Sequence, residues 1–450
     1  MKRKLNLILN VVLLVILCLT VFSGCTQKKV DPWEVESSLD WVGHIVKAMY
    51  GWIGSYGWTV VVFTVFLKIL MLPLDFWQRL SGKKMSAKMQ MMQPYIAEID
   101  KRYGADSQKG AEEKQKLFKK HGYNMTSSCL PMIITMAVFM TMFGGLRSYS
   151  TYNSVQTFNA LSQTYYQTYA EQIVNKTPET AAERKAHAVF VDAYTAVGGK
   201  LVDGKYSAQF NKAEYNNIAH CLTALQNEAT KLKASSVDAD KTLGNELTTL
   251  IASYSTAVTK AIQTKYSDME EGWLWIQNIA QPDTWEAIFP QYDSGSNSFT
   301  SFVDMSNFGG ETNGKELYNT IRDAVLQTGD RGEKGTWNGL MILPILSVGL
   351  SFLSMFVSQA MEKSGKKDPT QQQTSTEQQQ QQSNKATMIM MPLMMAYFGF
   401  IYTGAFGIYM VVNYLISILS TIALKAPVEK MVQKDLAKMQ VDSGKASYMR

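Results

Sequence analysis

The chain has 450 residues, of which 46% are hydrophobic and 18% charged, and its formal net charge is +6. The length allows two or three domains, and the charged fraction is low for a soluble protein of this size. Of the four cysteines only Cys221 lies in a long polar segment, which excludes disulfide bonds as the main source of stability.

The first 25 residues, MKRKLNLILNVVLLVILCLTVFSGC, combine basic residues, an apolar run and small residues before Cys25. This order is typical of a secretory signal peptide. The ending SGC resembles the lipobox of bacterial lipoproteins, which predicts a mature chain that begins at Cys25 and carries lipid (palmitate) there. An uncleaved anchor helix is the alternative. In both cases the residues after Cys25 begin outside the cytoplasm.

Five later segments are apolar and long enough, or nearly so, to cross a membrane. Four contain proline, which a spanning helix tolerates where neighbouring helices or water satisfy the freed carbonyl groups. The last two are separated only by the region around Gly404, which predicts a tight helical hairpin. We therefore expect an all-α membrane protein, a five-span helical bundle with a cytoplasmic helical hairpin and an exported helical insertion.

The connecting segments differ in charge, and this difference predicts the orientation. Basic residues predominate after the first span and in the C-terminal tail, whereas acidic residues outnumber basic ones in 149–335. Loops rich in lysine and arginine stay in the cytoplasm. We expect a bacterial plasma-membrane protein whose N-terminus is outside and lipid-anchored and whose C-terminus is cytoplasmic. The predicted order is a signal peptide (1–24), an exported segment with an amphipathic helix (25–56), span 1 (57–76), a cytoplasmic helical hairpin (77–124), span 2 (125–148), an exported helical insertion (149–271), an exported loop subdomain (272–337), span 3 (338–360), a disordered cytoplasmic linker (361–386), span 4 (387–403), span 5 (405–424) and a basic cytoplasmic tail (425–450).

The cytoplasmic hairpin carries a stripe of methionines. Met85, Met89 and Met92 recur at helical spacing, and the helical pattern breaks near Gly104. The stripe either packs on the partner helix of the hairpin or offers a soft apolar surface to varied partners. Both roles fit the pattern, at different points along the hairpin.

A single lysine interrupts the first apolar run, WTVVVFTVFLKILMLPL. A charge at the centre of a spanning helix costs roughly 2.5–3.5 kcal/mol. One interpretation is that the stem of Lys68 carries its amine toward the interface, since Asp75 lies only about 10 Å further along the helix. The other is that Lys68 faces a wet cavity that performs the function.

The sequence contains no GxxxxGK[ST], HExxH, GxSxG or CxxC motif, and its four histidines are far apart. We therefore expect no catalytic residue, no metal, no cofactor and no small-molecule substrate. The spans offer one cation together with hydroxyl and amide groups, which would suffice to line a hydrophilic groove. The predicted groove residues are Lys68, Thr64, Thr135, Tyr409 and Asn413.

Several stretches resemble one family in order and spacing. WTVVVFTVFLKILMLPL, KMQMMQPYIAEIDKRYG and FKKHGYNMTSSCLPMIITMAVFM resemble the first span, cytoplasmic hairpin and second span of the YidC/oxidase-assembly/albino family of membrane protein insertases. GWLWIQNIAQPD followed by MILPILS resembles the approach to its third span, and MIMMPLMMAYFGFIY and AFGIYMVVNYLIS resemble its last two. The lipoprotein signal resembles the form found in Gram-positive-type bacteria.

The resemblance implies a membrane protein insertase and chaperone that receives nascent membrane proteins in a cytoplasm-open groove and releases them into the lipid bilayer. The Sec translocon and the ribosome are further candidate partners. Lys68 matches a position where the family usually has arginine, and lysine keeps the charge but loses the bidentate fork. The hairpin methionines would contact the client. The alternative from the residues alone is a polytopic transporter or channel in which Lys68 binds an anionic substrate.

Overall fold

The fold of the described residues is helical throughout. Apart from isolated β-bridges, all their regular structure is helix, which confirms the all-α class. The predicted signal peptide, Cys25, nearly all of the 361–386 linker and most of the fourth predicted span lie outside the described residues. A computed structural model of the chain describes residues 29–104, 107–120, 125–208, 211–294, 298–308, 310–327, 337–362 and 397–447.

The chain divides into two compact units, each with its own internal packing. Unit 1 comprises residues 1–26, 45–146 and 341–450, and unit 2 comprises residues 27–44 and 147–340. Two helices, α2 (Trp41–Ile53) and α5 (Met125–Ala170), contribute residues to both units.

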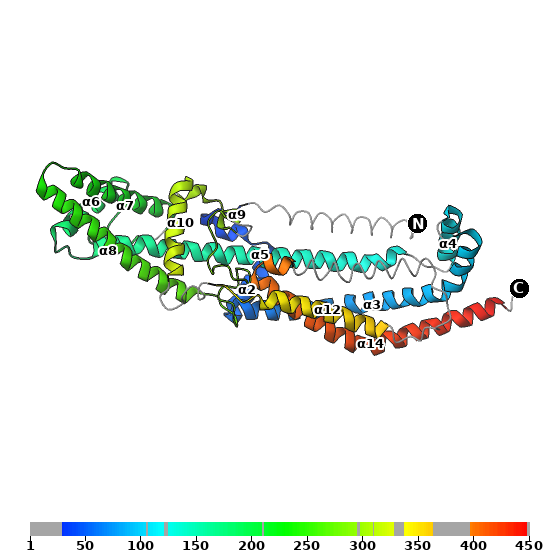
Figure 1. Cartoon of the computed structure of the whole chain (residues 1–450). Coiled ribbons are helices and arrows are strands. Elements are labelled where there is room, and N and C mark those ends of the chain that lie inside the picture. Colours follow the sequence, from blue (N-terminus) through cyan, green and yellow to red (C-terminus); the bar gives the residue numbers. More distant parts are fainter. Residues whose placement is uncertain are drawn as a thin grey trace. The chain divides into compact units, whose positions relative to one another are not determined.

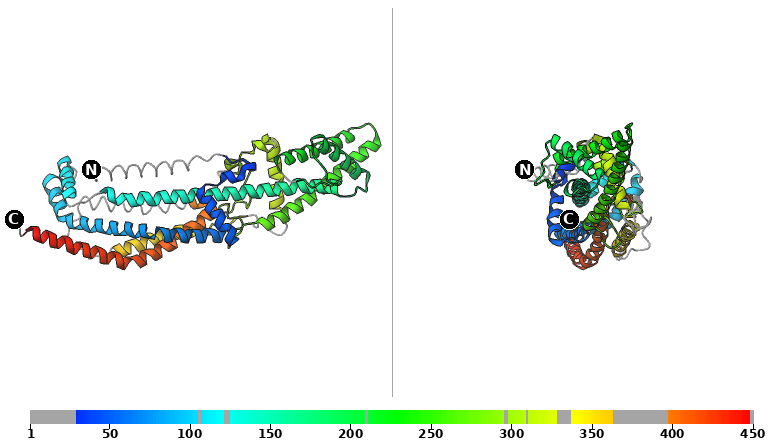
Figure 2. Two further views of the ribbon diagram at one scale, coloured as in Figure 1. Left: turned by 180° about the vertical axis from the view of Figure 1, so that it is seen from behind. Right: turned by 90° about the vertical axis from the view of Figure 1, so that its left-hand side faces the viewer.

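Unit 1 contains the helices that can cross a membrane. In the described part, three stretches are long and apolar enough, namely Tyr56–Met89, Ile342–Ala360 and Gly404–Asp435. They belong to α3 (Tyr56–Tyr103), α12 (Ile342–Glu362) and α14 (Gly404–Ser447). Helix α14 packs against both α3 and α12, and the three lie side by side in both views (Figures 1 and 2). The second predicted span falls within α5.

Helix α3 runs without interruption from the first predicted span into the predicted hairpin, and Pro73 and Pro94 lie inside it. It ends at Tyr103 because Gly104 follows with φ of +85°, a conformation that residues with a Cβ rarely adopt. Helix α4 (Gln108–Lys120) then packs back against the end of α3.

Unit 2 is a helical assembly around an aromatic core. Its main helices are the second part of α5, α6 (Ala181–Ala196), α7 (Lys212–Lys233) and α8 (Asp238–Met269), of which α6, α7 and α8 pack on one another (Figure 1). Two tyrosine hydroxyls of this core have specific acceptors: Tyr194 donates to Oε1 of Glu214 at 2.8 Å, and Tyr215 donates to the carbonyl of Phe308 at 3.1 Å. The short elements are the 3₁₀ helix Pro32–Ser38, the π-helix Glu171–Asn175, α9 (Phe299–Phe302) and the 3₁₀ helix Met305–Asn307.

One expectation for unit 2 needs correction. The region 272–337 was predicted as a loop subdomain, and its stretch 286–336 is rich in glycine, asparagine and serine, yet it contains the 17-residue helix α10 (Gly310–Leu326). Leu317, Ile321 and Val325 recur at i, i+4 and i+8, and all three are buried in the unit 2 core. Burial of this stripe stabilises a helix that its composition disfavours.

Candidate functional site

The lysine inside the first predicted span has a specific partner. Its Nζ lies 3.7 Å from Oδ2 of Asp75, two turns further along the same helix, and the two side chains are 19% and 14% exposed. The stem of Lys68 therefore follows α3 toward Asp75. Asp75 is its ion-pair partner among the described residues, and the pair is neither fully buried nor freely solvated.

A second cation shares the carboxylate. Arg79, one turn beyond Asp75, lies within electrostatic range of it, and Nη2 of Arg79 donates to Oγ of Ser420 on α14 at 3.4 Å. Two cations thus share one anion along α3, and the row keeps one net positive charge. The contact with Ser420 ties this row of charges to the helix that packs on α3.

Of the other predicted groove residues, Thr64 lies on α3, and Tyr409 and Asn413 lie on α14, the helix that packs against α3. Thr64 is buried and donates to the carbonyl of Val60 in its own helix at 2.6 Å, as threonines in spans commonly do. Tyr409 is buried and Asn413 half-buried on α14. Thr135 lies in α5, and its side chain is outside the described part of the structure.

An aromatic cluster that the sequence analysis did not single out holds α5 against the start of α14. The ring centroid of Phe139 lies 6.1 Å from that of Phe406 and 6.3 Å from that of Tyr409. Phe143 meets Tyr402 edge to face at 4.4 Å. Phe139 and Phe406 both contact the ring of Tyr409 and so help to orient it. The i, i+4 spacing of Phe139 and Phe143 was the available signal.

The methionine stripe lies partly inside the hairpin. Met89 and Met92 are buried, with Met92 only 2% exposed, and both pack with Leu117 and Phe118 of α4. Met85 is half-buried. This packing matches the first of the two roles considered for the stripe.

Helix α14 continues beyond the apolar part of unit 1 and pairs with α3 through charges. Lys83 lies 3.0 Å from Oε1 of Glu429, and Lys84 lies 2.5 Å from Oδ2 of Asp435. Glu429 and Asp435, two of the three acids of the predicted tail, therefore hold α14 along α3.

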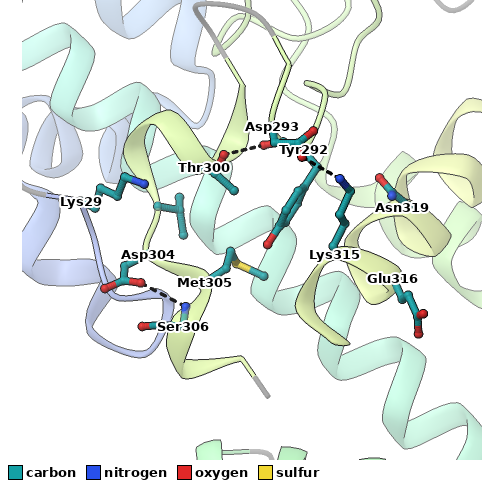
Figure 3. A pocket seen from close by; sticks show the side chains of 11 residues that line it. Lys29, Tyr292, Asp293, Thr300, Asp304, Met305, Ser306, Lys315, Glu316 and Asn319 are labelled. Carbon is teal, nitrogen blue, oxygen red and sulfur yellow. Dashed lines mark hydrogen bonds and ion pairs between the residues drawn. The ribbon is translucent and has the colours of Figure 1, made fainter. Parts of the chain in front are cut away.

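Unit 2 contains a polar recess of about 560 Å³ (Figure 3). Lys315 of α10 lies 2.6 Å from Oδ2 of Asp293, and this hydrogen-bonded ion pair lowers the pKa of Asp293. Asp304 accepts from Ser306, which lowers the pKa of Asp304, with a smaller contribution from Lys29. Both lysines of the recess thus have an acidic neighbour within it. The ion pair of Lys315 with Asp293 fixes α10 to the neighbouring loop, Lys29 lies near Asp304, and these charges do not single out a ligand.

The fold and site define the class of the protein. Long apolar helices that pack together in unit 1, one of which carries a half-buried row of alternating charges, are typical of a polytopic membrane protein. The family model described as "60Kd inner membrane protein" matches residues 48–187 and 247–431, well over half of the chain, and the chain belongs to this family.

Curated relatives resemble part of the chain. It is 33% identical over 114 residues to "Membrane protein insertase YidC" of Caldanaerobacter subterraneus subsp. tengcongensis, which covers 25% of this chain and 53% of that protein. The protein of the same name from Stenotrophomonas maltophilia is 35% identical over 99 residues, covering 22% and 17%. That of Campylobacter jejuni is 30% identical over 124 residues, covering 26% and 23%. The chain thus spans about half of the first relative and less of the others. No solved structure matches it.

Proposed function

We propose that the chain is a membrane protein insertase, which receives apolar segments of nascent proteins from the cytoplasm and releases them into the bilayer. The observation that carries this proposal is the half-buried cation of Lys68 inside a helix of spanning length, within a region that the family model matches. A charge there costs free energy, and such residues persist where they have a task.

The site acts on the client's polar tail through charge. In a partly buried site a cation attracts a carboxylate more strongly than in bulk water. The acidic tail of a client would exchange onto Lys68 and displace Asp75, which we propose as the resident counter-ion of the empty site. Because Arg79 also lies near Asp75, the displaced carboxylate keeps a cationic neighbour. The exchange therefore leaves no carboxylate without a cation.

Release needs no nucleotide in this mechanism. Once the tail has crossed, transfer of the client's apolar segment into lipid is favourable by roughly 25 cal/mol per Å² of apolar surface. The apolar residues that α3 exposes, Phe66, Ile69 and Leu70 among them, provide a surface along which that segment slides. We propose Thr64, Thr135, Tyr409 and Asn413 as the polar wall of the groove.

On the hairpin, we propose Met85 as the methionine that contacts the client, since Met89 and Met92 pack against α4. The orientation remains as proposed from charge, with the N-terminus outside and lipid-anchored through Cys25 and the C-terminus cytoplasmic. The Sec translocon and the ribosome are proposed partners, the ribosome for the basic tail.

The test starts with depletion of the protein in cells and scores the insertion of single-span clients that have short acidic exterior tails. The insertase proposal requires a defect in their insertion, and normal insertion contradicts it. Complementation with Lys68→Arg and Lys68→Ala then tests the site. We expect Arg to retain function and Ala to lose it. Equal activity of the wild type, Lys68→Arg and Lys68→Ala would mean that the Lys68 side chain only extends its amine to the membrane interface and has no role in insertion.

A further inference from the structure

Unit 2 holds a rigid loop structure, here named the tryptophan platform, made of residues 272–286 and 337–340. Asn338 is fully buried at its centre and crosslinks the two segments. Its Oδ1 accepts from the N–H of Asn278 at 2.7 Å, and its Nδ2 donates to the carbonyls of Asn278 and Pro282 at 2.9 and 2.6 Å. These three hydrogen bonds of Asn338 hold the backbone of both segments in one conformation.

Asp283 provides the second crosslink. Its buried carboxylate accepts from Nε1 of Trp275 at 3.1 Å and from the N–H of Leu340 at 2.9 Å. Gly339 lies so close to Asp283 that a Cβ at this position would overlap the carboxylate. Because both of its oxygens are engaged inside the platform, Asp283 presents no free charge at the surface.

The platform displays apolar side chains outward. Leu274, at the tip of a two-residue turn closed by hydrogen bonds between Trp273 and Ile276, is 68% exposed. Its φ is +54°, a left-handed conformation that is unfavourable for leucine. Trp285 and Leu340 are 56% and 53% exposed. A leucine that is both strained and exposed at the tip of a turn indicates a contact outside the unit.

The element that follows the platform in the chain indicates what that contact is. Helix α12, a candidate membrane span, begins at Ile342, two residues after Leu340. Two residues reach about 7 Å at most, so Leu340 lies at the boundary where this span enters the membrane. Tryptophan is enriched at such boundaries because its ring is apolar and its N–H is polar.

We propose that the tryptophan platform is a lipid-contact site, with Leu274, Trp285 and Leu340 seated at the boundary between headgroups and acyl chains beside the N-terminal end of α12. The contact sets the depth of α12 in the membrane. This inference rests on α12 crossing a membrane and is independent of the proposed insertase activity.

The test is photocrosslinking of the full chain in its cellular membrane. A benzophenone amino acid replaces Leu274 in one variant and Leu340 in another. Phe356, an exposed residue of α12, is the lipid-facing positive control, and Val202 and Val237, exposed apolar residues in other turns of unit 2, are the negative controls. After irradiation, adducts are identified by mass spectrometry.

Lipid adducts at positions 274 and 340, within about threefold of the yield at position 356 and at least about tenfold above positions 202 and 237, support the proposal. Adducts to another protein or to a second copy of the chain at both positions overturn it, and so does a lipid yield no higher than that of the negative controls. Because all five substitutions are at exposed positions, loss of the fold does not explain a negative result. Failure of the insertase proposal would leave these yields unchanged.

Discussion

Replacing Asp75 with asparagine removes the partner of Lys68 while keeping the shape of the side chain. The two charged atoms lie 3.7 Å apart, and each side chain is less than one-fifth exposed. With an effective dielectric constant of about 20, their attraction is about 4 kcal/mol. Desolvation of both groups offsets much of this. If a net attraction of about 1.4 kcal/mol between Lys68 and Asp75 remains, its removal changes the equilibrium constant for client binding at Lys68 about tenfold.

A client carboxylate has to compete with Asp75 for the same ammonium, so Asp75→Asn makes capture of acidic tails easier. The assay measures initial insertion rates into proteoliposomes that contain the full chain, with two single-span clients differing by one Asp or Asn in the exterior tail. We expect a gain of up to about tenfold at subsaturating concentrations for the acidic client and less than about twofold for the neutral one. High salt should reduce the gain, because the site is partly exposed.

Two variants make the result specific. Asp435→Asn removes another carboxylate that pairs with a lysine of α3, and it should leave the preference between the two clients unchanged. In Lys68→Ala/Asp75→Asn the gain should disappear, because the cation is gone. The reasoning is refuted if Asp75→Asn leaves the acidic client unaffected, or if the double variant shows the same gain.

Three further predictions concern stability and reactivity. Met92→Ala should destabilise the α3–α4 hairpin by about 2–5 kcal/mol, measured by hydrogen exchange of α4, whereas Met91→Ala, at an exposed neighbouring position, should have little effect; equal effects would contradict the packing described. Hydrogen bonds from the backbone of Thr180 lower the pKa of Glu183 in the folded chain. The stabilisation by Glu183 is therefore present above the pKa that this residue has in the unfolded chain, and it is lost as the pH falls through the lower pKa of the folded chain. The difference in melting temperature between wild type and Glu183→Gln should shrink from about pH 6 to about pH 3, and a constant difference would refute this. Burial raises the pKa of Cys221 to about 12, so maleimide should not label this thiol at pH 8 until the chain is unfolded, and rapid labelling of the folded chain would show that Cys221 is accessible.

Much of the fold was predictable because it follows from local pattern. Apolar runs of spanning length indicate membrane helices whatever surrounds them, since the bilayer requires internally bonded backbone. The prediction of a loop subdomain over 272–337 missed helix α10 for the opposite reason. The glycine and asparagine content of 286–336 obscures the apolar stripe of α10. This stretch becomes helical only because Leu317 and Ile321 are buried in an aromatic core that distant segments form.

The site shows the same division. The sequence by itself determined that a cation lies within the first span, because a lysine inside an apolar run is visible without any contact. Only the tertiary structure decided how that cation is compensated: side-chain direction joins Lys68 to Asp75, and the packing of α14 on α3 brings Ser420 to Arg79. It also decided that Met92 lies inside the hairpin. Periodicity shows which residues share a helix face, whereas what covers that face depends on segments remote in the chain.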